Sequence, residues 1–131
     1  MPSIQLFKAH PTLAEAWVMG KLAYEAEHPG KHVVITCVYR SPEEQAELYT
    51  HGRTQPGPIV TQLDGVTQRS QHNMDPARAI DFCVTIGGKV TWDVQEYEVA
   101  GPFFEAQGLI WGGRWKTFRD MPHVELPRAS T

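Results

Sequence analysis

Apolar residues in the first part of the chain recur with the spacing of a helix and then of a strand. Pro11 suits the first turn of a helix predicted over residues 11–27, and Pro29-Gly30 ends it. Five apolar residues recur at helical spacing in this segment: Leu13, Ala16, Trp17, Leu22 and Ala23. The β-branched run that follows predicts a buried strand over residues 33–39.

A second helix is predicted from Ser41 to about Tyr49. Ser41 can cap it, Pro42 suits its first turn, and Glu44 stands three residues after the cap, as in a capping box. Residues 51–69 then show little periodicity and are interpreted as a loop. A loop of this length inside a compact domain is often functional.

The second half of the chain mixes strands with a third helix. That helix is predicted over residues 93–107, where Gly101-Pro102 could interrupt it. Gly87-Gly88 fits a hairpin turn between two of the four predicted strands, which are 79–85, 89–92, 109–111 and 124–126. Helices mixed with hairpin strands predict an α+β domain in which helices flank a small, mainly antiparallel sheet.

Composition and charge narrow the class of protein. The chain has 131 residues, of which 41% are hydrophobic, so it fits a single domain over residues 1–131. A net charge of -3 disfavours sequence-independent nucleic-acid binding, which needs a dense basic surface. The local basic cluster of Arg114, Lys116 and Arg119 is interpreted as a solvated edge rather than a phosphate-binding patch.

The termini and the cysteines indicate an ordinary soluble chain. The first eight residues lack a charged start followed by an apolar stretch, so no signal peptide is expected and synthesis in the cytoplasm is predicted. No run approaches the roughly 20 apolar residues of a membrane span. Cys37 and Cys83 lie in apolar runs and are predicted to be buried free thiols, although the sequence does not exclude a disulfide.

Two of the six histidines have neighbours that suggest chemistry. His72 follows the long loop, and His123 follows Asp120 by three residues with the rigid Pro122 between them. Asp81 lies in an apolar strand, where a buried carboxylate costs free energy unless it is paired or binds a metal. Strand alternation could equally turn Asp81 toward solvent. The other histidines lie near element ends and are assigned no chemistry: His10, His28, His32 and His51.

His72, Asp81 and His123 have the residue types of a catalytic zinc site. Three protein ligands leave a fourth position for water, whose pKa zinc lowers to about 7 in well-known cases. A further carboxylate must then take and pass on a proton, and Asp120 is the natural candidate. Spacing alone makes this set suggestive rather than specific, because such residues are often close in sequence by chance.

Four segments, in order between residues 33 and 126, resemble the zinc D-alanyl-D-alanine carboxypeptidase and L-alanyl-D-glutamate endopeptidase family. Each is weak alone, and the four in order are strong. They are Val38-Tyr39-Arg40-Ser41-Pro42-Glu43-Glu44-Gln45, then Ser70-Gln71-His72 with Ala79-Ile80-Asp81-Phe82, then Trp111-Gly112-Gly113-Arg114-Trp115, and Asp120-Met121-Pro122-His123-Val124-Glu125-Leu126. The tryptophan-glycine segment resembles the L-alanyl-D-glutamate branch of phages and bacteria.

The resemblance implies a fold like that of D-Ala-D-Ala peptidases and hedgehog domains, and a role for each matched residue. His72, Asp81 and His123 would hold one zinc ion, and Asp120 would be the general base and later the acid. Arg40 would stabilise the developing oxyanion or hold a substrate carboxylate, although it could instead form an ordinary salt bridge.

The other matched residues have less specific implied roles. Ser70 would contact substrate or orient the loop, and the alternative of a turn serine is about as plausible. Trp111 and Trp115 could line the groove, with core packing the safer expectation for at least one of them. Glu125 is interpreted as structural or as the partner that orients His123.

The sequence departs from the family pattern between His72 and Asp81. Eight residues separate them where the family has six, and Ala77 stands where a glycine is expected. The turn-forming insert Asn73-Met74-Asp75-Pro76 could bulge outward, or Asp75 could replace Asp81 as ligand. Asp81 is favoured because the apolar strand around it matches the family.

These expectations define a function and its alternatives. The leading hypothesis is a monomeric phage endolysin that hydrolyses the L-alanyl-D-glutamate bond of peptidoglycan stem peptides with zinc. Release by a holin would bring it to the wall, and no separate wall-binding module or membrane insertion is expected. One alternative cuts the D-Ala-D-Ala bond instead. Another, a zinc-stabilised wall-binding or phage structural module without catalysis, is disfavoured by the presence of Asp120 and Arg40.

Overall fold

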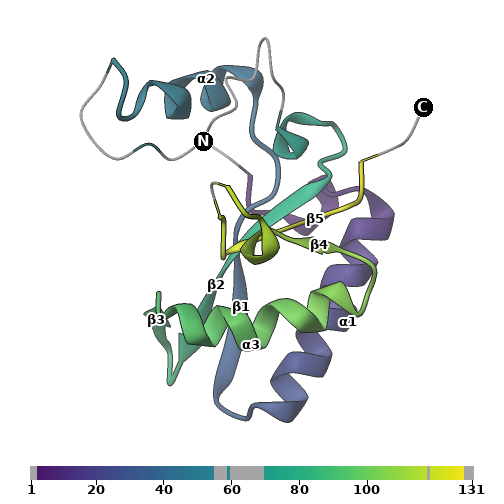
Figure 1. Cartoon of the computed structure of the whole chain (residues 1–131). Coiled ribbons are helices and arrows are strands. Elements are labelled where there is room, and N and C mark those ends of the chain that lie inside the picture. Colours follow the sequence, from purple (N-terminus) through teal and green to yellow (C-terminus); the bar gives the residue numbers. More distant parts are fainter. Residues whose placement is uncertain (1–2, 55–58, 60–69, 118, 129–131) are drawn as a thin grey trace.

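A computed structural model of the chain describes residues 3–54, 59, 70–117 and 119–128, and Figure 1 shows its arrangement. Within these ranges the chain forms three α-helices, five strands and three short 3-10 turns. The helices are α1 (Pro11–Glu27), α2 (Pro42–Thr50) and α3 (Val94–Glu105). The strands are β1 (Lys31–Cys37), β2 (Ala79–Ile86), β3 (Lys89–Thr91), β4 (Ile110–Trp111) and β5 (His123–Glu125). The 3-10 turns are η1 (Leu6–Lys8), η2 (Gln71–Asn73) and η3 (Gly112–Arg114).

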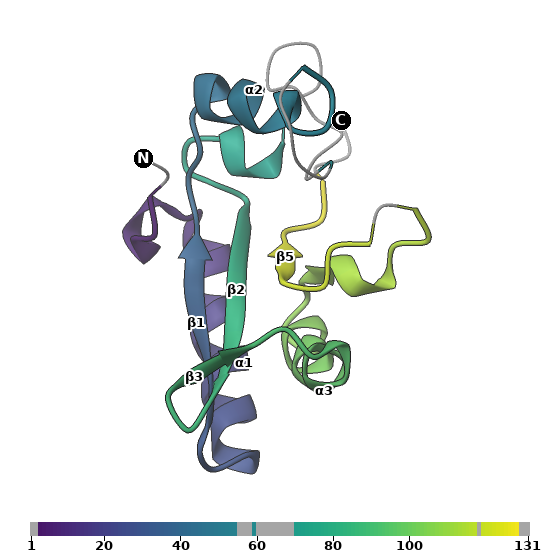
Figure 2. The same ribbon diagram turned by 90° about the vertical axis from the view of Figure 1, so that its left-hand side faces the viewer.

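The five strands form one antiparallel sheet. Its order is β1-β2-β5-β4, and β3, the return strand of a hairpin, pairs with the edge of β2 opposite β1. Figure 2 shows α1 behind β1 and β2, with α2 at the opposite end of the molecule from α3. The expected α+β class with a small antiparallel sheet is confirmed.

The core lies between the sheet and the pair formed by α1 and α3. Alternate residues of β2, among them Phe82, face the two helices and are fully buried. Trp17 of α1 stacks on Phe104 of α3 with ring centroids 4.9 Å apart, and Phe82 lies 5.5 Å from Phe104 and 5.8 Å from Trp17. Side chains alternate between the two faces of a strand, and the core uses one face of β2. The residues in between, such as Asp81, are therefore available to a site on the other face.

Most predicted boundaries differ from the observed ones by only a few residues. The predicted start of α2 is confirmed, because Ser41 and Glu44 form both hydrogen bonds of the capping box. The predicted loop over residues 51–69 falls mostly outside the described residues. Cys37 and Cys83 are buried free thiols, as predicted.

One predicted feature of α3 is absent, since the helix continues through Gly101-Pro102. Gly101 is needed there for space, because a Cβ atom would overlap the indole of Trp111. The indole N–H of Trp111 donates to the carbonyl of Met121 at 2.7 Å, which fixes the ring. The glycine therefore reflects close packing rather than the end of a helix.

Candidate metal centre

A row of three side chains crosses the sheet on the face that α1 and α3 leave open. Strand pairing sets Cys37 of β1 opposite Asp81 of β2, and Asp81 opposite His123 of β5. Directly opposed residues of antiparallel strands carry their side chains on the same face, with Cβ atoms about 5 Å apart. The register itself thus brings together residues 37, 81 and 123.

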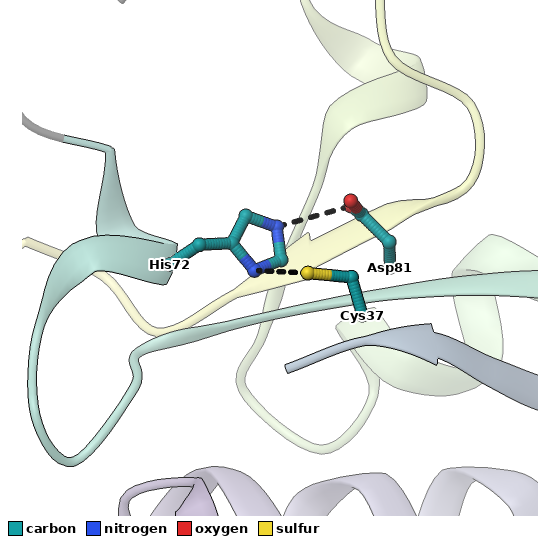
Figure 3. Close-up of side chains that lie close together, drawn as sticks. All are labelled: Cys37, His72 and Asp81. Carbon is teal, nitrogen blue, oxygen red and sulfur yellow. Dashed lines mark hydrogen bonds and ion pairs between the residues drawn. The ribbon is translucent and has the colours of Figure 1, made fainter. Parts of the chain in front are cut away.

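His72 reaches this row from the η2 turn. Ser70 caps the turn, because its Oγ accepts a hydrogen bond from the backbone N–H of His72 at 3.1 Å. The imidazole is 2% exposed, and its Nδ1 donates to the carbonyl of Val38 at 2.8 Å. His72 therefore enters the site in one orientation, with Nε2 directed at Asp81 as Figure 3 shows.

In each histidine one ring nitrogen has a hydrogen-bond partner outside the site, and the other ring nitrogen faces Asp81. Nε2 of His123 donates to Glu125 Oε1 at 2.8 Å, and its Nδ1 lies 2.9 Å from Asp81 Oδ1. Nε2 of His72 lies 3.2 Å from the same oxygen, yet it is buried and has no hydrogen-bond partner among the described residues. Two nitrogen lone pairs and a carboxylate oxygen at such short separations need a positive charge between them.

The pKa values of the two histidines and of Asp81 also indicate that positive charge is favoured at this site. Burial opposes charge on His72, but the Asp81 carboxylate outweighs it and raises the pKa of His72 to about 10. Burial is likewise outweighed at His123, where hydrogen bonds to Asp81 and Glu125 raise the pKa to about 9. Burial would raise the pKa of Asp81, yet the two imidazoles hold it well below its usual range. The positive charge that His72, His123 and Asp81 require could come from protons on both imidazole rings or from one divalent cation.

Two groups of donor residues could each hold a metal ion, and they share Asp81 while each contains one of the two histidines. Ligand atoms of Asp81, Asp120 and His123 lie within 4.8 Å of one another, as do those of Cys37, His72 and Asp81. The first group supplies nitrogen and oxygen donors, which suit zinc and related divalent ions. Glu125 also provides the carboxylate partner that orients a ligating imidazole.

Asp120 and Trp115 lie beside His123. Asp120 Oδ2 is 3.6 Å from His123 Nδ1, and the side chain is 36% exposed. Partial burial raises the pKa of Asp120, which favours a carboxyl group that can exchange a proton. The ring of Trp115 lies 5.2 Å from that of His123. Trp111, by contrast, is 3% exposed in the core and does not line the site.

Arg40 lies on the other side of Asp81. Its NH2 donates to Asp81 Oδ2 at 3.3 Å, and its NH1 donates to Gln45 Oε1 at 2.7 Å. A cavity of about 610 Å³ is lined by Arg40 together with Thr36, Cys37 and four residues of α2, three of which are glutamates. The arginine thus stands between the carboxylate and a space large enough for part of a peptide.

The insert after His72 leaves Asp81 in the site. Asp75 is exposed and belongs to neither group of metal-competent residues within the part of the chain that the structure describes. Ala77 is fully buried and pairs with Ala9, which returns the chain to the start of β2. The placement favours Asp81 over Asp75 as the third ligand.

Two neighbours of the site received no role from sequence reasoning. Cys37 was interpreted as a core thiol, and Gln45 was quoted only as part of a motif. Gln45 is a fully buried polar residue of α2. Sequence reasoning could have singled it out only after the buried face of the helix was known. Nothing local in the sequence marks Cys37, because its orientation depends on strand pairing.

Comparison with known proteins finds similarity to peptidases. The sequence model of a family described as D-alanyl-D-alanine carboxypeptidase matches residues 64–126. The peptidoglycan L-alanyl-D-glutamate endopeptidase CwlK of Bacillus subtilis is 38% identical over 111 residues, covering 77% of this chain and 64% of that protein. Over these residues the chain is similar to this peptidase family.

Two further relatives extend the comparison. An L-alanyl-D-glutamate peptidase of a Listeria phage is 30% identical over 109 residues, covering 81% of this chain and 34% of that protein. The crystal structure of the Serratia marcescens L-Ala D-Glu endopeptidase ChiX superposes with a TM-score of 0.72 and 25% identity, covering 93% of this chain and 83% of that one. The fold is therefore that of ChiX. The matched region spans less than two thirds of CwlK and of the phage peptidase.

None of the described helices is long and apolar enough to cross a membrane.

Proposed function

We propose that this chain is a zinc-dependent peptidase that hydrolyses the L-alanyl-D-glutamate bond of peptidoglycan stem peptides. The observation that carries the proposal is the convergence of His72 Nε2 and His123 Nδ1 on one oxygen of Asp81. Relatives named for that bond support the substrate class.

His72, Asp81 and His123 are the proposed ligands. A zinc ion held there would supply a Lewis acid and lower the pKa of water near the scissile carbonyl. The chain fixes both imidazoles in advance, through the Val38 carbonyl for His72 and the Glu125 carboxylate for His123. Such outer partners keep the ligands in the orientation that binding requires.

Asp120 and Arg40 are the proposed catalytic residues. Asp120 would take the proton from the attacking water and deliver it to the leaving amine, since its carboxyl group is near the ligands and partly open to solvent. Arg40 would stabilise negative charge on the carbonyl oxygen or hold a substrate carboxylate, with its guanidinium bordering the cavity. Ser70 would act by orienting His72, and Trp115 by contacting the substrate next to His123.

The biological setting is part of the proposal. A phage endolysin is supported by the phage relative and would reach the wall through a holin after synthesis in the cytoplasm. We expect a monomeric single domain without affinity for nucleic acid, in line with the net charge of -3.

The bond can be tested by product analysis on purified peptidoglycan. Cleavage between L-alanine and D-glutamate exposes a new amino group on glutamate, whereas D-Ala-D-Ala cleavage releases free D-alanine. The matching family is described by the D-alanyl-D-alanine bond, whereas the named relatives are described by the L-alanyl-D-glutamate bond. Release of D-alanine alone would therefore replace the leading proposal with the carboxypeptidase alternative.

Catalysis can be tested with Asp120→Asn. We expect the variant to bind one zinc ion per chain and to lose activity by roughly 100-fold or more, because a general base typically contributes 10²–10⁴-fold. Asp75→Asn is the matched control, since Asp75 is exposed and outside the site. Full activity in Asp120→Asn would exclude Asp120 as the general base. Wild-type protein that binds zinc but cleaves no stem peptide would instead favour a non-catalytic module.

A further inference from the structure

Cys37 faces the candidate site because of an irregularity in β1. Val33 pairs with Val84 and Ile35 with Phe82, so these β1 residues share the core face of the sheet. The register then shifts between Ile35 and Cys37, and Cys37 pairs with Asp81. An extra residue in a strand moves the following side chains to the other face, and bulges of this kind often re-aim a side chain at a functional site.

The sulfur of Cys37 contacts two residues of the site. Its Sγ accepts a hydrogen bond from Arg40 NH2 at 3.6 Å and lies 3.8 Å from His72 Nδ1. Figure 3 shows the thiol next to one ring nitrogen of His72 and Asp81 next to the other. His72 Nδ1 has a far stronger partner in the Val38 carbonyl at 2.8 Å, so the sulfur contributes little to the orientation of His72.

Arg40 depends more on the sulfur. NH1 is held by Gln45, whereas NH2 donates only long hydrogen bonds, to Asp81 Oδ2 at 3.3 Å and to Cys37. Within the described residues the buried Nε of Arg40 makes no hydrogen bond. Without the sulfur, NH2 would be free to move fully onto Asp81, and the guanidinium would turn away from the cavity.

We propose that Cys37 is a positioning residue that keeps the Arg40 guanidinium in place between Asp81 and the cavity. This inference rests on the proposed function, in which Arg40 stabilises the reacting carbonyl. The sulfur accepts a hydrogen bond from Arg40 NH2, and its bulk keeps the guanidinium from moving closer to Asp81. Cys37 also belongs to a group of donors that could hold a metal ion, and the proposal assigns its sulfur to Arg40 instead.

The first test compares Cys37→Ala, Cys37→Ser and Cys83→Ala in the whole chain. Cys37→Ala should lower kcat by about 10-fold, since partners outside the reacting groups typically contribute 10–100-fold. Its KM for a stem peptide and its affinity for Co²⁺, followed by visible absorption, should stay at wild-type values. Cys37→Ser keeps an acceptor and should recover most of kcat. Cys83→Ala is the matched control, because it also removes a thiol and Cys83 is 5% exposed where Cys37 is 6% exposed. This variant should leave kcat unchanged.

The second test is a double-mutant cycle with Arg40→Lys. Lysine lacks the second guanidinium nitrogen, so adding Cys37→Ala to Arg40→Lys should lower kcat no further. Additive losses, or loss of Co²⁺ affinity in Cys37→Ala, would overturn the inference. An unchanged kcat in Cys37→Ala would also overturn it. If the wild type binds no Co²⁺ or cleaves no stem peptide, the proposed function has failed instead.

Discussion

At the scale of single residues, the charge of Asp81 determines the character of the site. One of its oxygens faces two imidazole nitrogens and the other faces Arg40, so all four groups share a small buried volume. A carboxylate in such a position is stable only when it is paired or bound to a cation. The sequence indicated the cost of burying Asp81 but could not show which partners would meet it.

The ligand assignment can be tested by metal analysis of His72→Ala, Asp81→Ala and Asp75→Ala. We expect the first two variants to lose bound zinc, because each removes one of three ligands, and Asp75→Ala to retain it. Zinc content per chain, measured after dialysis, checks this expectation. Loss of zinc from Asp75→Ala together with retention in Asp81→Ala would move the third ligand to the insert.

At the scale of secondary structure elements, strand register and one bulge assemble the site. Asp81 has its two cross-strand neighbours only because β1 and β5 pair with β2 at these positions. A shift of one residue would turn Asp81 into the core and Phe82 outward. Hydrophobic periodicity predicted the strands, but the pairing depends on contacts between distant segments.

The close packing of α3 against β4 gives a second prediction. Gly101→Ala should destabilise the protein by about 1–3 kcal/mol, because the added methyl group overlaps the fixed indole of Trp111. The helix propensity of alanine would recover at most about 1 kcal/mol of that loss. Chemical denaturation measures the free energy of unfolding.

Gln95→Ala on the exposed side of α3 serves as the control, and should change stability by less than about 0.5 kcal/mol. Equal stability of Gly101→Ala and the wild type would show that Trp111 can move. In that case the continuity of α3 through Pro102 would need another explanation.

At the scale of the whole molecule, the proposed ligands tie together separate parts of the chain. His72 comes from η2, Asp81 from β2 and His123 from β5, so a bound ion connects segments that folding must first bring together. An ion that binds only the folded state stabilises it by mass action. The site and the fold should therefore be coupled energetically.

Removal of metal should lower the melting temperature. With free zinc at 100 times its dissociation constant the stabilisation is about 2.7 kcal/mol. For a chain of this length that corresponds to a shift on the order of 10 °C. Calorimetry before and after chelation, and after zinc is restored, measures the shift. His72→Ala should show no response to zinc, and a response equal to that of the wild type would place the stabilising ion elsewhere.

Sequence by itself determined the elements and the inventory of reactive groups. Local signals sufficed for these: helical spacing in α1, the capping box at Ser41, and an aspartate within the apolar run of β2. Motif order also indicated the family. These features depend on interactions between residues close in the chain, which is why they can be read without coordinates.

Only the tertiary structure decided how the groups meet. It placed Trp111 in the core and Trp115 beside His123, and it turned Cys37 toward Arg40 through the register shift in β1. Strand pairing and packing are set by contacts between distant segments, and a single residue of register reverses which face a side chain occupies. That is the physical reason why the site's neighbours, unlike its elements, could not be derived from local sequence.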